Sequence, residues 1–273
     1  MDNREEQRYI LDHDYHIHSV LSICARDERQ TPQAILQNGI QRGLKELCLT
    51  DHYWDERVPC NSAVNRWYER QGHDHVCQLC PLPQAEGVRF LFGCEADMDS
   101  DDVIGLSPSR YNEFDFIVVA TTHFHHTHWG KAGNLSNKEL AKRWVERFDA
   151  VLNSSLPFGK VGIAHLACSL INRRSYEDYL ETLSLIPQQD LERLFYKAAR
   201  LGLGIELNWG DMEHCEDAAV IRIFRTAKLC GCKFYLGSDA HTPEELQDLN
   251  DVFERAVTLL DLKESDKFVW RKQ

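Results

Sequence analysis

The chain has 273 residues, 43% of them hydrophobic, which is enough to bury the core of a large α/β domain and argues against extended disorder. Its formal net charge of −12, from 43 acidic and 31 basic residues, argues against a broad surface for nucleic acid or for an anionic membrane. The ten cysteines lack the spacing of a disulfide scaffold, the charged amino terminus does not resemble a signal peptide, and no stretch reaches the roughly 20 apolar residues of a membrane-spanning helix. We therefore expect a cytoplasmic protein with reduced thiols.

Two short strands near the start of the chain end in residue types that bind metals. The first, residues 14–18, ends in His16 and His18, whose imidazoles lie on one face because side chains alternate along a strand. The second strand is predicted at residues 46–50 and is followed closely by His52.

Residues 53–87 interrupt this pattern and are rich in Trp, Asn, Gln, His and Pro. We expect a long insertion over the top of the fold, which supplies Trp54, Trp67 and Tyr68 to a substrate. Its single CxxC motif, residues 77–80, is only a weak indication of a separate zinc site.

The rest of the chain alternates strands and helices. Strands are predicted at residues 88–94, 114–120, 161–164, 203–207 and 233–236, and helices at about 31–43, 136–152, 188–201, 217–230 and 242–260. Seven strands that alternate with helices or long loops indicate a parallel sheet, and no linker divides residues 1–273, so we expect a single domain. Pairs of ligand-type residues at both ends of the chain suggest a closed barrel whose first and last strands are neighbours.

Polar residues follow the strands, and the carboxyl ends of the strands carry the site in a parallel barrel. Six imidazoles and two carboxylates exceed the four ligands of one tetrahedral zinc ion and suit two or three divalent ions, zinc, manganese or iron. Such ions convert a bound water into a hydroxide nucleophile and hold an anionic oxygen, as phosphate ester hydrolysis requires. A lone strand-end histidine is more often a surface or hydrogen-bonded residue, but eight suitable residues favour a metal centre. They are His16, His18, His52, Glu95, His123, His165, Asp239 and His241.

These residues form a series that resembles the PHP family, named for polymerase and histidinol phosphatase. The series is His16-x-His18-Ser19, Thr50-Asp51-His52, Gly93-Cys94-Glu95, His123, Ala164-His165 and Gly237-Ser238-Asp239-Ala240-His241. The resemblance implies a distorted TIM-like (β/α)7 barrel, a trinuclear metal site at the carboxyl ends of the strands, and phosphoesterase activity.

The resemblance also implies which residue holds which ion. The first ion would be held by His16, His18, Glu95 and Asp239, and Glu95 would bridge to a second ion held by His123 and His165. A third ion would be held by His52 and His241. The catalytic residues would be Glu95, Asp239 and His241. Family members often place a further histidine ligand for the third ion where this chain has Cys24. Cys24 could bind as a thiolate, or it could leave the third position weak or filled by Asp27.

Substrate contacts are harder to place. Asn208 closes the sixth strand, and Arg173 or Arg174 could bind a phosphate group, with Arg26 and Lys131 as weaker candidates. His125, His126 and His128 are expected at the edge of the site, and Asp51 is expected to hydrogen-bond a ligand imidazole.

The leading interpretation is a histidinol-phosphatase-like phosphoesterase that acts on a small anionic phosphorylated substrate. The alternatives are an amidohydrolase-type hydrolase, a nuclease or proofreading phosphodiesterase, and an inactive metal-binding module. We expect no membrane partner, and the net charge disfavours nucleic acid. The oligomeric state stays open.

Overall fold

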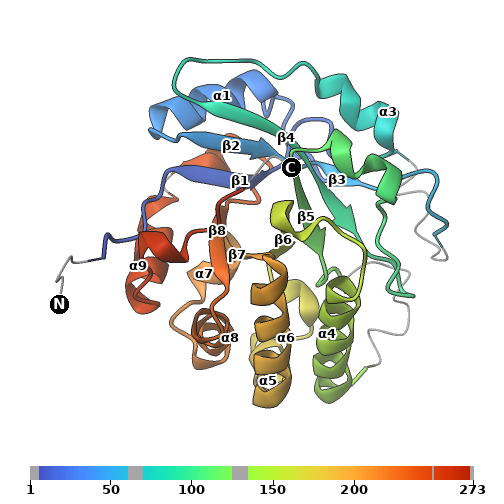
Figure 1. The fold of residues 1–273 in the computed structure, drawn as a ribbon, viewed down its shortest axis with the longest axis vertical. Coiled ribbons are helices and arrows are strands. Elements are labelled where there is room, and N and C mark those ends of the chain that lie inside the picture. Colours follow the sequence, from blue (N-terminus) through green and yellow to red (C-terminus); the bar gives the residue numbers. More distant parts are fainter. Residues whose placement is uncertain (1–5, 61–69, 125–134, 248, 271–273) are drawn as a thin grey trace.

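Parallel strands curl into a nearly closed barrel at the centre of the molecule (Figure 1). The computed structural model describes residues 6–60, 70–124, 135–247 and 249–270. The strands follow the order β1-β2-β4-β5-β6-β7-β8, as an α/β barrel of seven parallel strands requires. Their bounds are β1 His13–Ile17, β2 Glu46–Leu49, β4 Arg89–Asp97, β5 Phe116–Ala120, β6 Val161–Ala164, β7 Gly204–Asn208 and β8 Lys233–Gly237.

The first and last strands meet, as the sequence predicted. Ile17 forms a parallel bridge with Ala240, and the backbone N–H of Asp239 donates to the carbonyl of His16 at 2.8 Å. A short strand, β3 (His52–Tyr53), continues the second strand and pairs with β4 in the same register as β2. These pairings bring His16, His52 and Asp239 to one end of the barrel.

Helices cover the outside of the barrel, and the strongest predictions from capping residues are confirmed. Thr31 caps α1 by accepting a hydrogen bond from the N–H of Ala34, and Ser136 and Glu139 form the capping box of α4. The helix bounds are α1 Pro32–Gln41, α3 His73–Val76, α4 Asn137–Leu152, α5 Tyr176–Ser184, α6 Gln188–Leu201, α7 Trp209–Glu213, α8 Ala218–Leu229 and α9 Asn250–Leu259.

The last helix begins later than the sequence predicted. Only a short 3-10 turn, Glu244–Leu246, follows Pro243, the backbone at Gln247 is extended, and α9 starts at Asn250. The acidic side chains of this turn make one long-range and one local contact: Glu244 binds the distant Arg29 at 2.8 Å, and Glu245 accepts from the N–H of His241 at 2.7 Å. These contacts hold the turn beside the mouth of the barrel.

The carboxyl-terminal segment seals the end of the barrel opposite the metal-ligand residues. Phe268 and Trp270 are buried in one apolar cluster with Tyr15, Phe116 and Tyr235. The N–H of Phe268 donates to the carbonyl of Phe234 at 2.7 Å, which adds the segment to the edge of β8. Aromatic rings fill the barrel interior here, so the open mouth lies at the other end.

The described part of the insertion is folded onto the barrel. Trp54 is 5% exposed and packs against Val58 and Val103, so it is a buried residue of the insertion rather than a substrate contact. Trp67 and Tyr68, like His125, His126, His128 and Lys131, lie outside the described residues. Cys77 and Cys80 are free thiols, and in the described part of the chain the groups of possible metal ligands all lie at the barrel mouth.

Candidate metal centre

The strand-end residues predicted as ligands converge at the mouth of the barrel. His16 comes from β1, His52 from β3 and Glu95 from β4, while the others lie within four residues after the ends of β1, β5, β6 and β8. Six of the eight side chains are buried, whereas Asp239 and His241 are 29% and 15% exposed. The centre is therefore accessible from the side of β8.

Glu95 stands between two pairs of imidazoles. Its Oε2 lies 3.6 Å from Nε2 of His16 and 3.4 Å from Nε2 of His18. Its Oε1 lies 3.1 Å from Nε2 of His165 and 3.8 Å from Nε2 of His123. Each oxygen thus faces a different pair of nitrogen ligands, which is the geometry of a carboxylate that bridges two cations. Oε2 is buried and makes no hydrogen bond, as expected of an atom that serves a cation.

Asp239 completes the first group of candidate ligands. Its Oδ1 lies 3.0 Å from Nε2 of His18 and 3.6 Å from Nε2 of His16. Asp239 and His165 both have positive φ angles, 56° and 30°, in the region that non-glycine residues seldom adopt. Such strain persists only where surrounding contacts fix the backbone, and it occurs here at two ligand positions.

Two buried carboxylates bind the other nitrogen of the ligand imidazoles. Oε1 of Glu206 lies 2.7 Å from Nδ1 of His16. Asp97 lies 3.0 Å from Nδ1 of His52 and 2.6 Å from Nδ1 of His123. A partner at Nδ1 leaves Nε2 free to bind a cation and raises its basicity.

Hydroxyl groups complete this outer layer. Oγ1 of Thr122 lies 2.7 Å from Nδ1 of His165, and Oγ of Ser22 lies 3.1 Å from Nδ1 of His18. Asp51 was expected in this role, but it accepts hydrogen bonds from the N–H and the hydroxyl of Ser19 instead. The sequence did not predict Asp97, Thr122, Ser22 or Glu206 as imidazole partners.

The electrostatic field of the centre favours bound cations. Burial opposes a charge on His16, but the carboxylates of Glu206, Asp239 and Glu95 raise its pKa well above its ordinary value. Burial would raise the pKa of Glu95, but the imidazoles of His52 and His16 hold it well below its ordinary value. The carboxylates therefore stay ionised and stabilise positive charge at the mouth.

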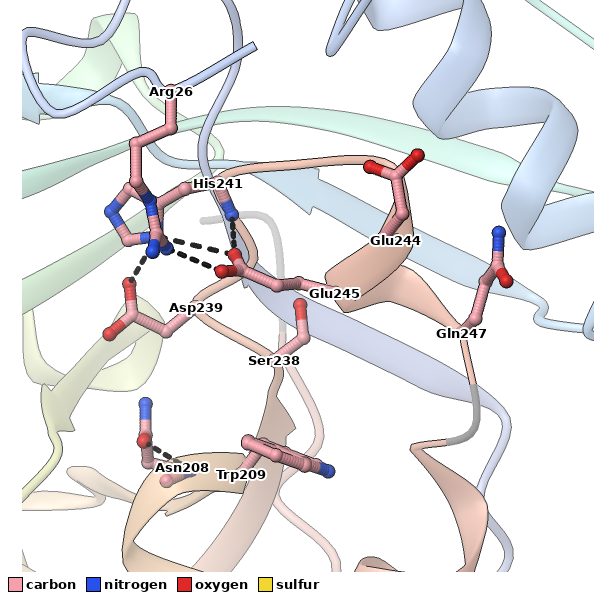
Figure 2. Close-up of a pocket in the computed structure, with 10 residues that line it drawn as sticks. Arg26, Asn208, Trp209, Ser238, Asp239, His241, Glu244, Glu245 and Gln247 are labelled. Atoms are coloured by element: carbon pink, nitrogen blue, oxygen red, sulfur yellow. Dashed lines mark hydrogen bonds and ion pairs between the residues drawn. The ribbon is translucent and has the colours of Figure 1, made fainter.

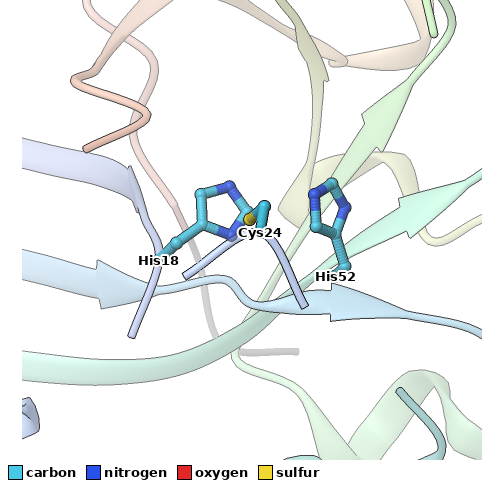
Figure 3. A group of neighbouring side chains, drawn as sticks. All are labelled: His18, Cys24 and His52. Atoms are coloured by element: carbon cyan, nitrogen blue, oxygen red, sulfur yellow. The ribbon is translucent and has the colours of Figure 1, made fainter. Parts of the chain in front are cut away.

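Cys24 lies within this cluster (Figure 3). His18, Cys24 and His52 form one group of possible ligand atoms within 4.8 Å of one another, and His18, Asp239 and His241 form another. Burial would raise the pKa of the Cys24 thiol, but His18 and His52 lower it to about 3. Asp27, the alternative ligand, binds Arg29 at 3.0 Å instead.

A cavity of about 490 Å³ opens beside Asp239 and His241 (Figure 2). Asn208 and Arg26, two predicted substrate contacts, line it together with Trp209. Arg26 binds Glu245 on the cavity rim at 2.6 Å, and Asn208 binds the N–H of Gly210 through Oδ1 at 3.0 Å. The amide nitrogen of Asn208 lies 3.4 Å from the Glu206 carboxylate.

The two predicted arginines lie elsewhere. Nε of Arg174 donates to Oδ1 of Asn172 at 3.1 Å, and its guanidinium also binds the side chain of Asn137. Arg173 lines a separate hollow beside Tyr176. The structure thus brings Asn208 and Arg26 to the mouth but gives Arg173 and Arg174 no contact with the ligand cluster.

Comparisons with known proteins find a family model and solved structures that are similar to this chain. A model of the PHP domain matches residues 14–210. The histidinol phosphate phosphatase of Lactococcus lactis, solved with zinc, L-histidinol and phosphate, superposes with a TM-score of 0.52 at 13% identity, covering 90% of this chain and 93% of that one. A Listeria monocytogenes protein described as a candidate histidinol phosphatase gives a TM-score of 0.54 at 11% identity, over 86% and 97% of the two chains. No curated protein sequence matches.

Proposed function

The chain belongs to the PHP family, and on that premise we propose that it is a metal-dependent phosphoesterase that hydrolyses a small phosphate monoester. The observation that carries the proposal is the position of Glu95, with one oxygen toward His16 and His18 and the other toward His165 and His123. Two neighbouring cations bridged by a carboxylate are a recurring arrangement in enzymes that hydrolyse phosphate esters.

The residues present fit a centre of two or three divalent ions. His16, His18, Glu95 and Asp239 would hold the first ion, Glu95, His123 and His165 the second, and His52 and His241 a third. When bound, zinc, manganese or iron would supply a nucleophilic water at neutral pH and neutralise charge on the phosphate. The protein contributes orientation, because Glu206 and Asp97 fix the ligand imidazoles and leave their Nε2 atoms free.

The cavity beside Asp239 is the proposed site of the alcohol portion of the substrate. Asn208 and Arg26 lie on its wall and would bind substrate oxygens, while the indole of Trp209 gives an apolar surface. A cavity of about 490 Å³ suits a small organic molecule rather than a polymer. Arg173 and Arg174, which were proposed as phosphate contacts from the sequence, are less well placed for this role.

Histidinol phosphate is the first natural substrate to test, because both solved relatives carry that name. A bridge formed by Glu95 also favours a phosphoesterase over an amidohydrolase-type enzyme, for which a carboxylated lysine would be the expected bridge.

Among the described residues, no helix has the length and apolar character to cross a membrane.

The test is hydrolysis of p-nitrophenyl phosphate and of L-histidinol phosphate by protein stripped with a chelator and reloaded with zinc or manganese. Glu95→Gln should lower turnover by at least about 100-fold, because even residues behind metal ligands contribute up to that much. Glu254→Gln, which changes an exposed carboxylate that binds Arg8, is the matched control and should retain activity. Absence of turnover with any phosphate ester by metal-loaded protein would refute the proposal.

A further inference from the structure

Cys24 differs from the other cysteines in what surrounds its sulfur. All ten cysteines are free thiols in the described structure, and Cys24 is the one that belongs to a group of possible metal ligands there. Cys48 and Cys94, by contrast, lie fully buried in apolar clusters of the barrel. In Figure 3, the side chain of Cys24 lies between the rings of His18 and His52.

The loop that carries Cys24 is held against the mouth by the insertion. The N–H of Ile23 donates to Oε1 of Gln71 at 3.0 Å, and His75 binds the carbonyl of Leu21 through Nε2 at 2.8 Å. Gln71 is 1% exposed, so this contact is part of the buried structure. The hydroxyl of Ser22 lies 3.1 Å from the sulfur. These contacts fix the loop with the sulfur turned toward the histidines.

Two further atoms of the centre lack hydrogen-bond partners. Nδ1 of His241 and Oε2 of Glu95 are both buried, and neither makes a hydrogen bond. Glu95 as a whole is 1% exposed, and although Nδ1 of His52 lies 2.9 Å from its Oε2, that contact is not aligned as a hydrogen bond. Buried polar atoms without partners are uncommon, and here both belong to residues of the proposed metal centre, where a cation would satisfy them.

We propose that Cys24 is a thiolate ligand of a third divalent ion, which it holds together with His52 and His241, and that this position therefore selects zinc over manganese. The inference rests on the metal centre of the proposed function but not on its substrate. Zinc binds thiolate and imidazole well, with a zinc–sulfur distance of about 2.3 Å, whereas manganese favours carboxylate and water oxygens. The first and second positions, which share Glu95 and contain no sulfur, lack this additional preference for zinc.

Cobalt titration tests the sulfur directly, because a thiolate bound to Co²⁺ gives a charge-transfer absorption band in the near ultraviolet. Metal-free protein should bind three cobalt ions per chain and develop this band. Cys24→Ser should lack the band, and its affinity for the third ion should fall by at least about tenfold. Loss of a direct ligand should reduce the affinity at least as much as loss of a residue that only hydrogen-bonds a ligand. Cys24→His should bind three ions without the band.

Cys168→Ser is the matched control, because Cys168 is also half-buried at the mouth, with its sulfur 3.8 Å from Nδ1 of His165. It should develop the same band as the wild type. Zinc binds most nitrogen and oxygen sites more tightly than manganese, so the wild type and Cys24→His are compared after loading from an excess of manganese over zinc. The zinc content per chain should then be lower in Cys24→His than in the wild type.

The inference is overturned if the band persists in Cys24→Ser, if the wild type binds three cobalt ions without it, or if the wild type binds only two. Circular dichroism of both Cys24 variants establishes that they are folded. None of these measurements uses a substrate, so failure of the phosphatase assay and failure of the thiolate ligand are distinguishable results.

Discussion

The carboxylate of Glu206 fills the space in which a side chain at Gly237 would lie. A Cβ atom on Gly237 would be 2.8 Å from both Cδ of Glu206 and Cβ of His16, closer than such atoms approach one another. Glu206 binds Nδ1 of His16 at 2.7 Å and the backbone N–H of His165 at 2.6 Å. One buried carboxylate thus couples the proposed first and second ion positions, and a glycine in β8 makes room for it.

Gly237→Ala should therefore weaken metal binding although residue 237 is not a ligand. Displacement of Glu206 releases His16 and His165, and loss of such outer contacts typically costs about 10–100-fold in metal affinity. Competition with a chromogenic zinc chelator measures the change. Gly72→Ala is the control, because its added Cβ would meet atoms only at 3.6 Å and beyond. Equal affinities in the two variants would contradict this role of Gly237.

Asp97→Asn should weaken the second and third positions more than the first. Each carboxylate oxygen of Asp97 serves one imidazole, His52 or His123, and an amide can accept at only one of its two atoms. We expect about a 10–100-fold loss of affinity for the ions that these histidines hold. Calorimetric titration with zinc should still resolve one tight position per chain. A uniform loss at all positions would argue against separate partners for separate ions.

The meeting of most candidate ligands at one mouth was predictable from the sequence, because parallel strands bring their carboxyl ends to one edge. That rule places His16, Glu95 and Asp239 at the same mouth although they lie far apart in the chain. The partners of these ligands were not predictable in the same way. Asp97 follows Glu95 by two residues on the same strand, so its face could be inferred, but the two imidazoles that it binds depend on the packing of β3 and the end of β5.

The missed helices and misplaced residues have similar causes. The α5 segment buries only Tyr179, Thr182 and Leu183, so its apolar pattern was too weak to predict a helix. Arg174 follows a ligand strand closely in sequence, but it binds Asn172 and Asn137 within its own neighbourhood. Long-range partners decide these positions, and a single sequence does not reveal them.

Removal of metal should lower the stability of the whole barrel. The folded chain gathers the ligands and the unfolded chain does not, so each position stabilises the fold by about 4 kcal/mol when the free ion is at 1,000 times its dissociation constant. Thermal unfolding with and without excess chelator measures the effect, and zinc should restore the transition. Glu95→Gln should show a smaller shift than the wild type. A transition that chelator leaves unchanged would indicate that the purified protein carries no tightly bound ion.

Asp12 should make the stability of the fold sensitive to acid. Burial would raise the pKa of Asp12, but hydrogen bonds from His13 and Lys267 lower it to about 2 from 3.8. Because the folded-state pKa is depressed, the stabilisation is fully present above about pH 4 and is lost as the pH falls through about 2. The shift corresponds to about 2 kcal/mol, which partial exposure reduces to about 1 kcal/mol. The free energy of unfolding, measured with urea at pH 7, should be about 1 kcal/mol higher for the wild type than for Asp12→Asn.

At pH 3 the same difference should shrink to roughly half, since the unfolded carboxyl is by then largely protonated while the folded one is not. Lys267 donates to Asp12 at 2.9 Å from the segment that also carries Phe268, so the ion pair fastens that segment to the chain just before β1. Lys263→Gln is a suitable control, because in the described structure Lys263 pairs with the exposed carboxylate of Asp261. Lys263→Gln should change the free energy of unfolding only slightly at both pH values. If the effect of Asp12→Asn is the same at both pH values, the carboxylate contributes through its shape rather than its charge.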